Sequence, residues 1–135
     1  MLTEPNSTDR ARDHLLGRMG MRDVLVTDDR LVIEVDNRPD MTNIRGALQG
    51  GLVATLIDVA AGRLAGRHVA AGQDVTTADM TVHYLAPVLA GPARAEATIV
   101  RAGRRLIVTA VDVHDVGGDR LAARATLSFA VLGPR

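Results

Sequence analysis

The segment from Gly50 to about Gly66, GGLVATLIDVAAGRLAG, constrains the fold more than any other part of the chain. Apolar residues occupy almost every position from Leu52 to Ala61, and no polar stripe appears before Arg63. A helix on the surface of a protein would show such a stripe, so a helix with this pattern is expected to be buried on all sides. The rest of the chain must therefore wrap around it.

The remaining sequence predicts strands joined by short turns. Asp28-Asp29 and Gly117-Gly118 are turn signals between segments in which apolar and polar residues alternate. Consecutive hairpins of this kind form a mostly antiparallel sheet. We therefore expect an α+β fold, in which a curved sheet of about five to six strands is wrapped around one long apolar helix. The expected strands are Val24–Thr27, Arg30–Asp36, Asp74–Leu85, Ala93–Arg101, Arg104–His114 and Arg120–Leu132.

A single domain is expected over residues 9–135, because the length of 135 residues suits one core and no linker-like segment interrupts it. Residues 1–8 are polar and are expected to form a disordered tail. A short helix is expected to follow the tail and to end near Met19, and Ser, Thr and Asn are favoured at the start of a helix. Its candidate N-caps are Asn6, Ser7 and Thr8.

Composition argues against several functional classes. The chain has 16 basic and 16 acidic residues, and this balance argues against general electrostatic binding to nucleic acid or to an anionic membrane. It contains no Cys and no Lys, so thiolate nucleophiles, disulfides, Schiff bases and P-loop lysines are excluded. Neither a signal-peptide pattern nor an apolar run of membrane-spanning length is present, and a cytoplasmic location is therefore expected.

Asp58 is the one acidic residue within the apolar helix. A mid-helix Asp has poor helix propensity, and a charged carboxylate that is buried without a partner is costly. One interpretation is that the carboxylate reaches the surface or a partner at a subunit interface. The other is that it is a functional carboxylate, which acts as a base or a nucleophile.

Gln49, Gly50 and Gly51 stand at the start of the expected helix. The first N–H groups of a helix lack partners within it and lie at the positive end of the helix dipole. They could stabilise a carbonyl oxygen that gains negative charge during a reaction. The alternative interpretation of the two glycines is a tight turn or close packing of the helix against the sheet.

The spacing of Gly50 and Asp58 has a consequence for assembly. The two residues are eight positions apart, or about 12 Å along a helix. They cannot both touch one reacting carbonyl within one chain, but they could if the helices of two chains packed antiparallel. Catalysis by this pair therefore predicts a two-fold symmetric dimer with two composite sites. We expect a homo-oligomer, either a dimer or a dimer of dimers.

The run NIRGALQGGLVATLID, from Asn43 to Asp58, resembles the small hotdog-fold acyl-CoA thioesterases of the phenylacetate-pathway and 4-hydroxybenzoyl-CoA types. The pattern of that family is an Asn or Gln, then His-Gly-Gly after a short loop, then an Asp or Glu further along the helix. Similar segments follow at Val75–Pro87, at Gly103-Arg104-Arg105 and in the closing strand. The resemblance covers about residues 20–132 and implies a hotdog fold.

The resemblance implies catalytic roles for four residues. Asp58 matches the catalytic carboxylate, which acts as a nucleophile or as a general base for water. Gly50 matches the glycine whose N–H polarises the thioester carbonyl. Asn43 matches the position that helps to place substrate or water, and Thr77 matches a Ser or Thr near the carboxylate. The family dimer brings Gly50 and Asp58 of different chains to one site.

Strand alternation decides between Thr77 and Thr76 for the position near the carboxylate. Regular alternation places Thr77 on the same face as Asp79 and opposite Met80, so Thr77 is preferred. The sequence departs from the family at Gln49, where many relatives have His. Glutamine can donate and accept hydrogen bonds but cannot change charge near neutral pH.

The remaining candidates concern substrate binding. Gln49 and Gly51 flank the glycine at the helix start, and an apolar acyl pocket between subunits is expected to include Leu52, Val53, Leu56 and Met80. His83 and Tyr84 lie on the long strand, where each is more often structural. The guanidinium group suits phosphate, so three arginines could meet the phosphates of CoA, unless they form a solvated turn. These are Arg101, Arg104 and Arg105.

The sequence therefore predicts hydrolysis of an acyl- or aroyl-CoA to the free acid and CoA, without a metal or an organic cofactor. The histidines show no metal-ligand spacing. One alternative is a hotdog protein that binds acyl-CoA or a carrier-bound acyl chain without turnover, and Gln49 motivates it. A hotdog hydratase or dehydratase ranks third, because such enzymes carry a His and acid pair and no His lies between Asn43 and Asp58.

Overall fold

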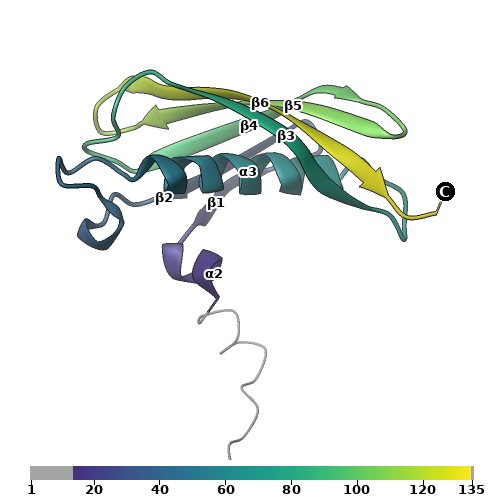
Figure 1. The fold of residues 1–135 in the computed structure, drawn as a ribbon, viewed down its shortest axis with the longest axis horizontal. Coiled ribbons are helices and arrows are strands. Elements are labelled where there is room, and N and C mark those ends of the chain that lie inside the picture. Colours follow the sequence, from purple (N-terminus) through teal and green to yellow (C-terminus); the bar gives the residue numbers. More distant parts are fainter. Residues whose placement is uncertain (1–13, 135) are drawn as a thin grey trace, which may run out of the picture.

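The computed structural model describes residues 14–134 (Figure 1). Helix α2 (Leu15–Met19) comes first, and helix α3 (Gly50–Gly66) follows a loop that contains the 3-10 turn η1 (Pro39–Met41). The strands are β1 (Arg22–Val26), β2 (Arg30–Val35), β3 (Asp74–Tyr84), β4 (Ala93–Ala102), β5 (Leu106–Asp115) and β6 (Arg120–Leu132). The expected tail at residues 1–8 and the candidate N-caps Asn6, Ser7 and Thr8 lie outside the described residues.

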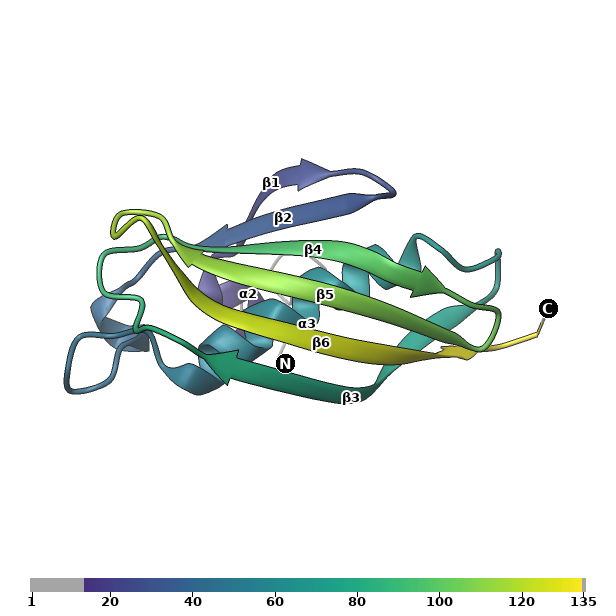
Figure 2. The ribbon, with the colours of Figure 1, turned by 90° about the horizontal axis from the view of Figure 1, so that it is seen from above.

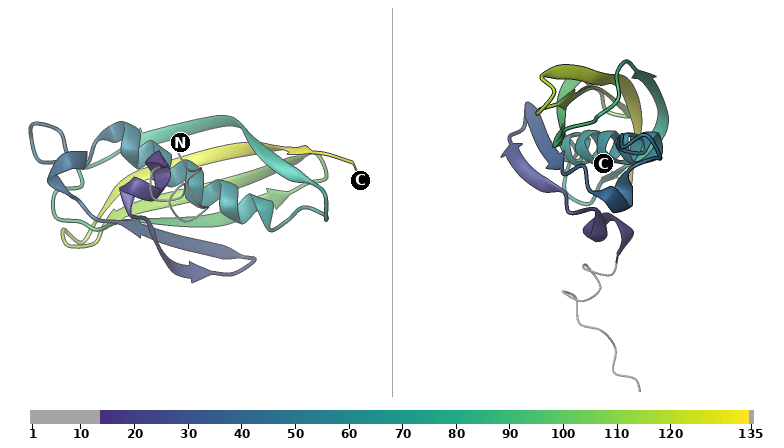
Figure 3. Two further views of the ribbon diagram at one scale, coloured as in Figure 1. Left: turned by 90° about the horizontal axis from the view of Figure 1, so that it is seen from below. Right: turned by 90° about the vertical axis from the view of Figure 1, so that its left-hand side faces the viewer.

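The strands form one antiparallel sheet in the order β1-β2-β4-β5-β6-β3 (Figure 2). The sheet curves around α3, as the end-on view in Figure 3 shows. The predicted α+β arrangement of a curved antiparallel sheet and one central helix is confirmed, and the predicted bounds of α3 and β6 agree with the structure. Within residues 14–134, no helix has both the length and the apolar character needed to cross a membrane.

One stripe of α3 packs against the sheet. Val53, Leu56, Ile57, Ala60, Ala61, Leu64 and Ala65 are buried at the three- and four-residue spacing of one helix face. The sheet meets this stripe with aliphatic side chains, among them Leu31, Ile33 and Val35 of β2, which are at most 1% exposed. Burial of a large aliphatic side chain contributes about 1.5–3 kcal/mol to stability. This layer of contacts is the core of the domain.

The other face of α3 is not covered within one chain. Ala54, Thr55 and Asp58 are half-buried, and Gly51 and Arg63 are exposed. The prediction that α3 is buried on all sides is therefore wrong for the isolated chain. The sheet curves over one side of the helix only, and the view from below shows α3 in front of it (Figure 3). Small side chains occupy much of the uncovered face.

The two edges of the sheet differ. At one edge β1 is short, its pairing with β2 shifts register between Asp23 and Leu25, and Asp23 forms a two-pronged ion pair with Arg63 of α3 (2.6 and 2.9 Å). The Arg63 guanidinium lowers the pKa of Asp23. At the other edge β3 has 11 residues, all exposed or half-buried. It pairs along its length with β6 and offers its second side to solvent.

Asp115 joins the loops at one end of the sheet. Its carboxylate is fully buried and accepts hydrogen bonds from the backbone N–H groups of Gly91 (2.7 Å), Leu89 (3.1 Å), Ala90 (3.3 Å) and Gly118 (3.4 Å). Burial alone would raise the pKa of Asp115, but these four donors outweigh it and leave the pKa below its ordinary value of 3.8. The charged carboxylate therefore stabilises the folded state.

We expect Asp115→Asn to lower the free energy of unfolding by about 2–4 kcal/mol at pH 7, because an amide group cannot accept all of these hydrogen bonds. Because the folded-state pKa is lowered, the stabilisation is present above pH 3.8 and is lost as the pH falls through the folded-state value. Urea unfolding at pH 7 and at about pH 3 measures both effects.

Asp119→Asn is the matched control, because Asp119 is an exposed residue of the same turn. Its effect should stay within about 0.5 kcal/mol. Equal stabilities of the two variants at pH 7 would contradict the role given to Asp115.

Candidate active site

Asp58 and Thr77 are in direct contact. Thr77 Oγ1 of β3 donates a hydrogen bond to Asp58 Oδ1 of α3 at 2.7 Å. Asp58 is half-buried on the uncovered side of the helix. Within residues 14–134 its second oxygen, Oδ2, accepts no hydrogen bond. One oxygen of this carboxylate is therefore held in place by the protein, and the other is open to an incoming group.

A bulge in β3 decides which residues accompany Thr77. The pairing of β3 with β6 shifts register between Thr77 and Asp79, so Ala78 is an extra residue. Thr77 lies opposite Phe129 and Met80 lies opposite Leu127, and both partners are buried on the inner face of the sheet. The expectation that Thr77 shares a face with Asp79 and opposes Met80 is therefore wrong, although Thr77 does meet Asp58.

The same bulge places His83 away from the site. Asp79 pairs with Ser128 and His83 pairs with Arg124, and these positions belong to the outer face of the sheet. His83 was one of the candidates for substrate binding. Because Ala78 is an extra residue, the alternation counted from Thr77 is shifted by one position beyond it, so Met80 faces α3 and His83 does not.

The start of α3 leaves two backbone N–H groups without partners. The carbonyl of Gln49 accepts from the N–H groups of Leu52 (2.9 Å) and Val53 (3.0 Å). Gly50 and Gly51 precede these residues in the helix, and within residues 14–134 their N–H groups find no acceptor. The Gln49 side chain points back to the loop, where Nε2 donates to the carbonyl of Thr42 at 3.4 Å. The predicted pair of open donors is thus present in the isolated chain.

Asn43 shapes the loop that leads to this helix start. Its Oδ1 accepts from the N–H groups of Arg45 (2.9 Å) and Ala47 (3.2 Å), which closes a turn over residues 43–47. The side-chain carbonyl of Asn43 is therefore engaged in the loop. The predicted role of Asn43 in placing substrate or water would therefore fall to its side-chain nitrogen, Nδ2.

A cavity of about 350 Å³ lies at the helix start. Asn43, Gly50 and Val53 line it from the loop and the helix, and Tyr84 and Val88 are among the residues that line it from the other side. Of the four residues expected to form an acyl pocket, Val53 is part of this wall. Leu56 is fully buried in the core, so it cannot line an open pocket.

Leu52 and Met80 lie elsewhere. Leu52 lines a different cavity, of about 260 Å³, between α3 and α2. Met80 is 37% exposed on β3. In the isolated chain the four residues therefore do not line one common pocket, and the predicted pocket between subunits stays a prediction.

Tyr84 is the residue that sequence reasoning undervalued. Its hydroxyl donates to the carbonyl oxygen of Gly50 at 2.7 Å. Its ring lies 3.6 Å from the position that a Cβ on Gly50 would take. The signal available in the sequence was regular strand alternation, which places Tyr84 on the same face as Met80.

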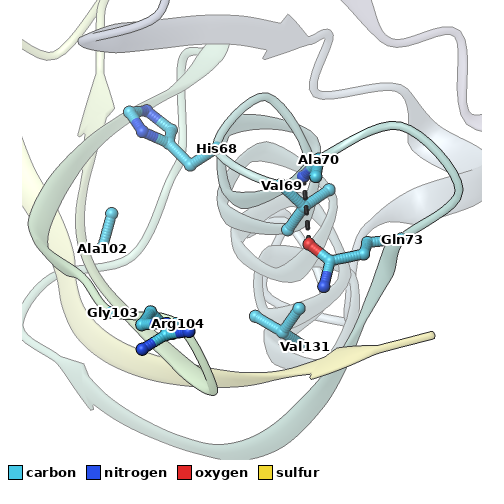
Figure 4. Close-up of a pocket in the computed structure, with 8 residues that line it drawn as sticks. All are labelled: His68, Val69, Ala70, Gln73, Ala102, Gly103, Arg104 and Val131. Carbon is cyan, nitrogen blue, oxygen red and sulfur yellow. Dashed lines mark hydrogen bonds between the residues drawn. The ribbon is translucent and has the colours of Figure 1, made fainter. Parts of the chain in front are cut away.

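A second cavity, of about 380 Å³, lies at the opposite end of α3 (Figure 4). His68, Gln73 and Val131 line it together with Arg104, from the turn between β4 and β5. Arg101 and Arg105 are exposed and are not among its lining residues. Of the three arginines proposed to meet phosphate, all of which are exposed, Arg104 alone lines this open pocket.

Comparison with known proteins places this geometry in a family. The model of the Thioesterase superfamily matches residues 45–122. A provisionally named esterase from Saccharolobus solfataricus is 28% identical over 120 residues, which is 89% of this chain and 84% of that protein. A second one from the same organism is 33% identical over 91 residues, or 67% of this chain and 59% of its own length.

Solved structures agree on the fold. A thioesterase from Haemophilus influenzae superposes with a TM-score of 0.84 at 20% identity, covering 98% of this chain and 92% of that one. A Bacillus halodurans protein solved with CoA superposes with a TM-score of 0.79 at 29% identity, covering 93% and 82%. Since the family match spans more than half of the chain and contains both Gly50 and Asp58, the protein belongs to the Thioesterase superfamily and is a hotdog-fold thioester hydrolase.

Proposed function

We propose that this protein hydrolyses an acyl- or aroyl-CoA thioester to the free acid and CoA. The observation that carries the proposal is the Asp58 carboxylate, which is held at one oxygen by Thr77 and open at the other. The Gly50 N–H group, which is open at the start of α3, supplies the complementary part of such a site. The Bacillus halodurans relative, which was solved with CoA, supports CoA as the carrier of the acyl group.

The proposed site requires two chains. Gly50 and Asp58 stand about 12 Å apart along one helix, which is too far for both to act on one carbonyl. The uncovered face of α3 and the open side of β3 lie at the same edge of the domain. We propose that two copies pair through β3 about a two-fold axis, with their α3 helices antiparallel. Gly50 of one protomer then meets Asp58 of its partner.

The mechanism follows from this pairing. Gly50 N–H stabilises the negative charge that develops on the thioester oxygen. Asp58 either attacks the carbonyl carbon, forming an anhydride that water later cleaves, or removes a proton from the attacking water. The C–S bond breaks, CoA leaves as the thiolate and takes up a proton, and the acid is released. No metal or organic cofactor takes part in these steps.

The remaining residues bind and orient the substrate. Asn43 places water or the thioester at the helix start, and Val53 contributes to the acyl pocket. Arg104 offers a guanidinium group to the phosphates of CoA. His83 has no part in the proposal, because it lies on the outer face of the sheet.

A non-catalytic acyl-CoA-binding protein is the second candidate. Gln49 favours it, because this side chain turns back to the Thr42 carbonyl and cannot titrate as the His of many relatives can. Retained affinity for acyl-CoA without any hydrolysis would support this candidate over a hydrolase.

Asp58→Asn should lower kcat by at least about 100-fold, because the amide keeps the size of the side chain but is neither a base nor a nucleophile. The measurement is thiol release from short-chain, long-chain and aryl-CoA substrates. Asp79→Asn makes the same chemical change on the outer face of β3 and should leave kcat within about twofold. An Asp58→Asn enzyme with wild-type kcat would move the chemistry to other residues.

Thr77→Val should lower kcat by roughly fivefold to tenfold, because it removes the hydroxyl that fixes Asp58 and keeps the β-branched shape. Thr76→Val is the control, since Thr76 pairs with Ala130 on the outer face. Steady-state kinetics of both variants are measured on the best substrate. A Thr77→Val enzyme with the same kcat as Thr76→Val would show that the contact between Thr77 and Asp58 has no role in catalysis.

Mixing Gly50→Pro and Asp58→Ala chains tests the composite site. Proline is tolerated at the first helical position and removes the N–H group of residue 50. Random mixing makes half of the dimers mixed, and each mixed dimer has one intact site, so about a quarter of wild-type activity should return. Mixed dimers that form, as native mass spectrometry would detect, but remain inactive would refute a site built from two chains.

A further inference from the structure

The hydroxyl of Tyr84 makes a specific contact with the backbone at the start of α3. Its oxygen lies 2.7 Å from the carbonyl oxygen of Gly50, to which it donates. Tyr84 is 56% exposed and lines the cavity at the helix start. The bond therefore lies at the wall of the proposed site and is not part of the packed core.

The Gly50 carbonyl and the Gly51 N–H belong to one planar peptide group. A carbonyl oxygen has two lone pairs, so that of Gly50 can accept from Tyr84 as well as within the helix. A hydrogen bond accepted by a carbonyl fixes the plane of its peptide and polarises the N–H on the opposite side. The Tyr84 hydroxyl thus acts on the N–H of Gly51, one of the two donors that have no acceptor within residues 14–134.

Local packing and conformation do not explain why residue 51 is glycine. Gly51 is not among the glycines with positive φ in the described part of the chain. A Cβ at this position would meet nothing within 4 Å. A Cβ at position 51 would occupy part of the open space beside the unpaired N–H group, and glycine leaves that space free for the approach of a ligand oxygen.

We propose that Tyr84 is a positioning residue for a two-donor oxyanion site, in which the N–H groups of Gly50 and Gly51 both face the thioester oxygen. This inference rests on the proposed function and assigns a second donor to the same site. Tyr84 transfers no proton and need not touch the substrate. Its hydroxyl fixes the orientation of the peptide group that joins Gly50 and Gly51, and it makes the Gly51 N–H a stronger hydrogen-bond donor.

Tyr84→Phe removes the hydroxyl and keeps the ring against Gly50. We expect kcat to fall roughly fivefold to tenfold and KM to change less than about twofold, because the lost interaction acts on the transition state. Thr81→Val is the matched control, since it removes a hydroxyl from the same strand at a position paired with Thr126 on the outer face. It should leave both parameters unchanged.

Amide resonances provide a readout that does not depend on turnover. In a ¹⁵N–¹H NMR spectrum the Gly51 signal, identified from its loss in Gly51→Ala, should move in Tyr84→Phe and stay in place in Thr81→Val. An active wild type with unchanged kcat in Tyr84→Phe would overturn the inference, as would a lower kcat with an unmoved Gly51 signal.

A wild type that hydrolyses no thioester would instead refute the proposed function. In that case the Gly51 signal still decides whether the Tyr84 hydroxyl fixes the orientation of the peptide group between Gly50 and Gly51. A signal that moves supports the positioning role in a binding site, and an unmoved signal overturns it.

Discussion

Helix α3 is held against the sheet by a stripe of buried aliphatic side chains, and the position of each candidate catalytic group follows from that contact. Leu56, Ile57 and Leu64 are fully buried in the stripe, which fixes both the depth of the helix and its rotation about its axis. With the rotation fixed, Asp58 lies on the flank where Thr77 of β3 can reach it. The hydrophobic packing thus orients a polar group that it does not contain.

The Phe and Tyr residues of the chain both pack against helix α3. The sequence has one Phe and one Tyr, and both lie against glycines of α3. Phe129 approaches Gly62 within the core, where a Cβ would be 3.4 Å from its ring. Tyr84 approaches Gly50 at the exposed end. The core is built mainly from Ala, Val, Leu and Ile. The Phe129 ring in this core and the Tyr84 ring at the exposed end of α3 set how closely the sheet approaches the helix at the two glycines.

Much of this architecture could be predicted from the sequence. The apolar run and its flanking glycines defined α3, and turn residues placed the strand ends close to the observed ones. The resemblance to hotdog thioesterases placed Thr77 near Asp58, as the structure does, but the faces of Asp79, Met80 and His83 were not predicted. A regular period of two cannot reveal that Ala78 is an extra residue, because the bulge depends on the pairing with β6. The bond between Tyr84 and Gly50 depends on how a strand crosses a helix, which local sequence does not record.

The two edges of the sheet differ, and this difference limits how many copies of the chain can join through their strands. A strand edge is a template for further strands, and a protein with two open edges can grow into fibres. Here β1 is short and irregular, and Asp23 ties it to Arg63 of α3. Among the strands of residues 14–134, only β3 presents a long edge, so two copies that pair there would leave the tethered, irregular β1 strands at the ends of the joined sheet. The ion pair between Asp23 and Arg63 would then protect the protein from polymerising.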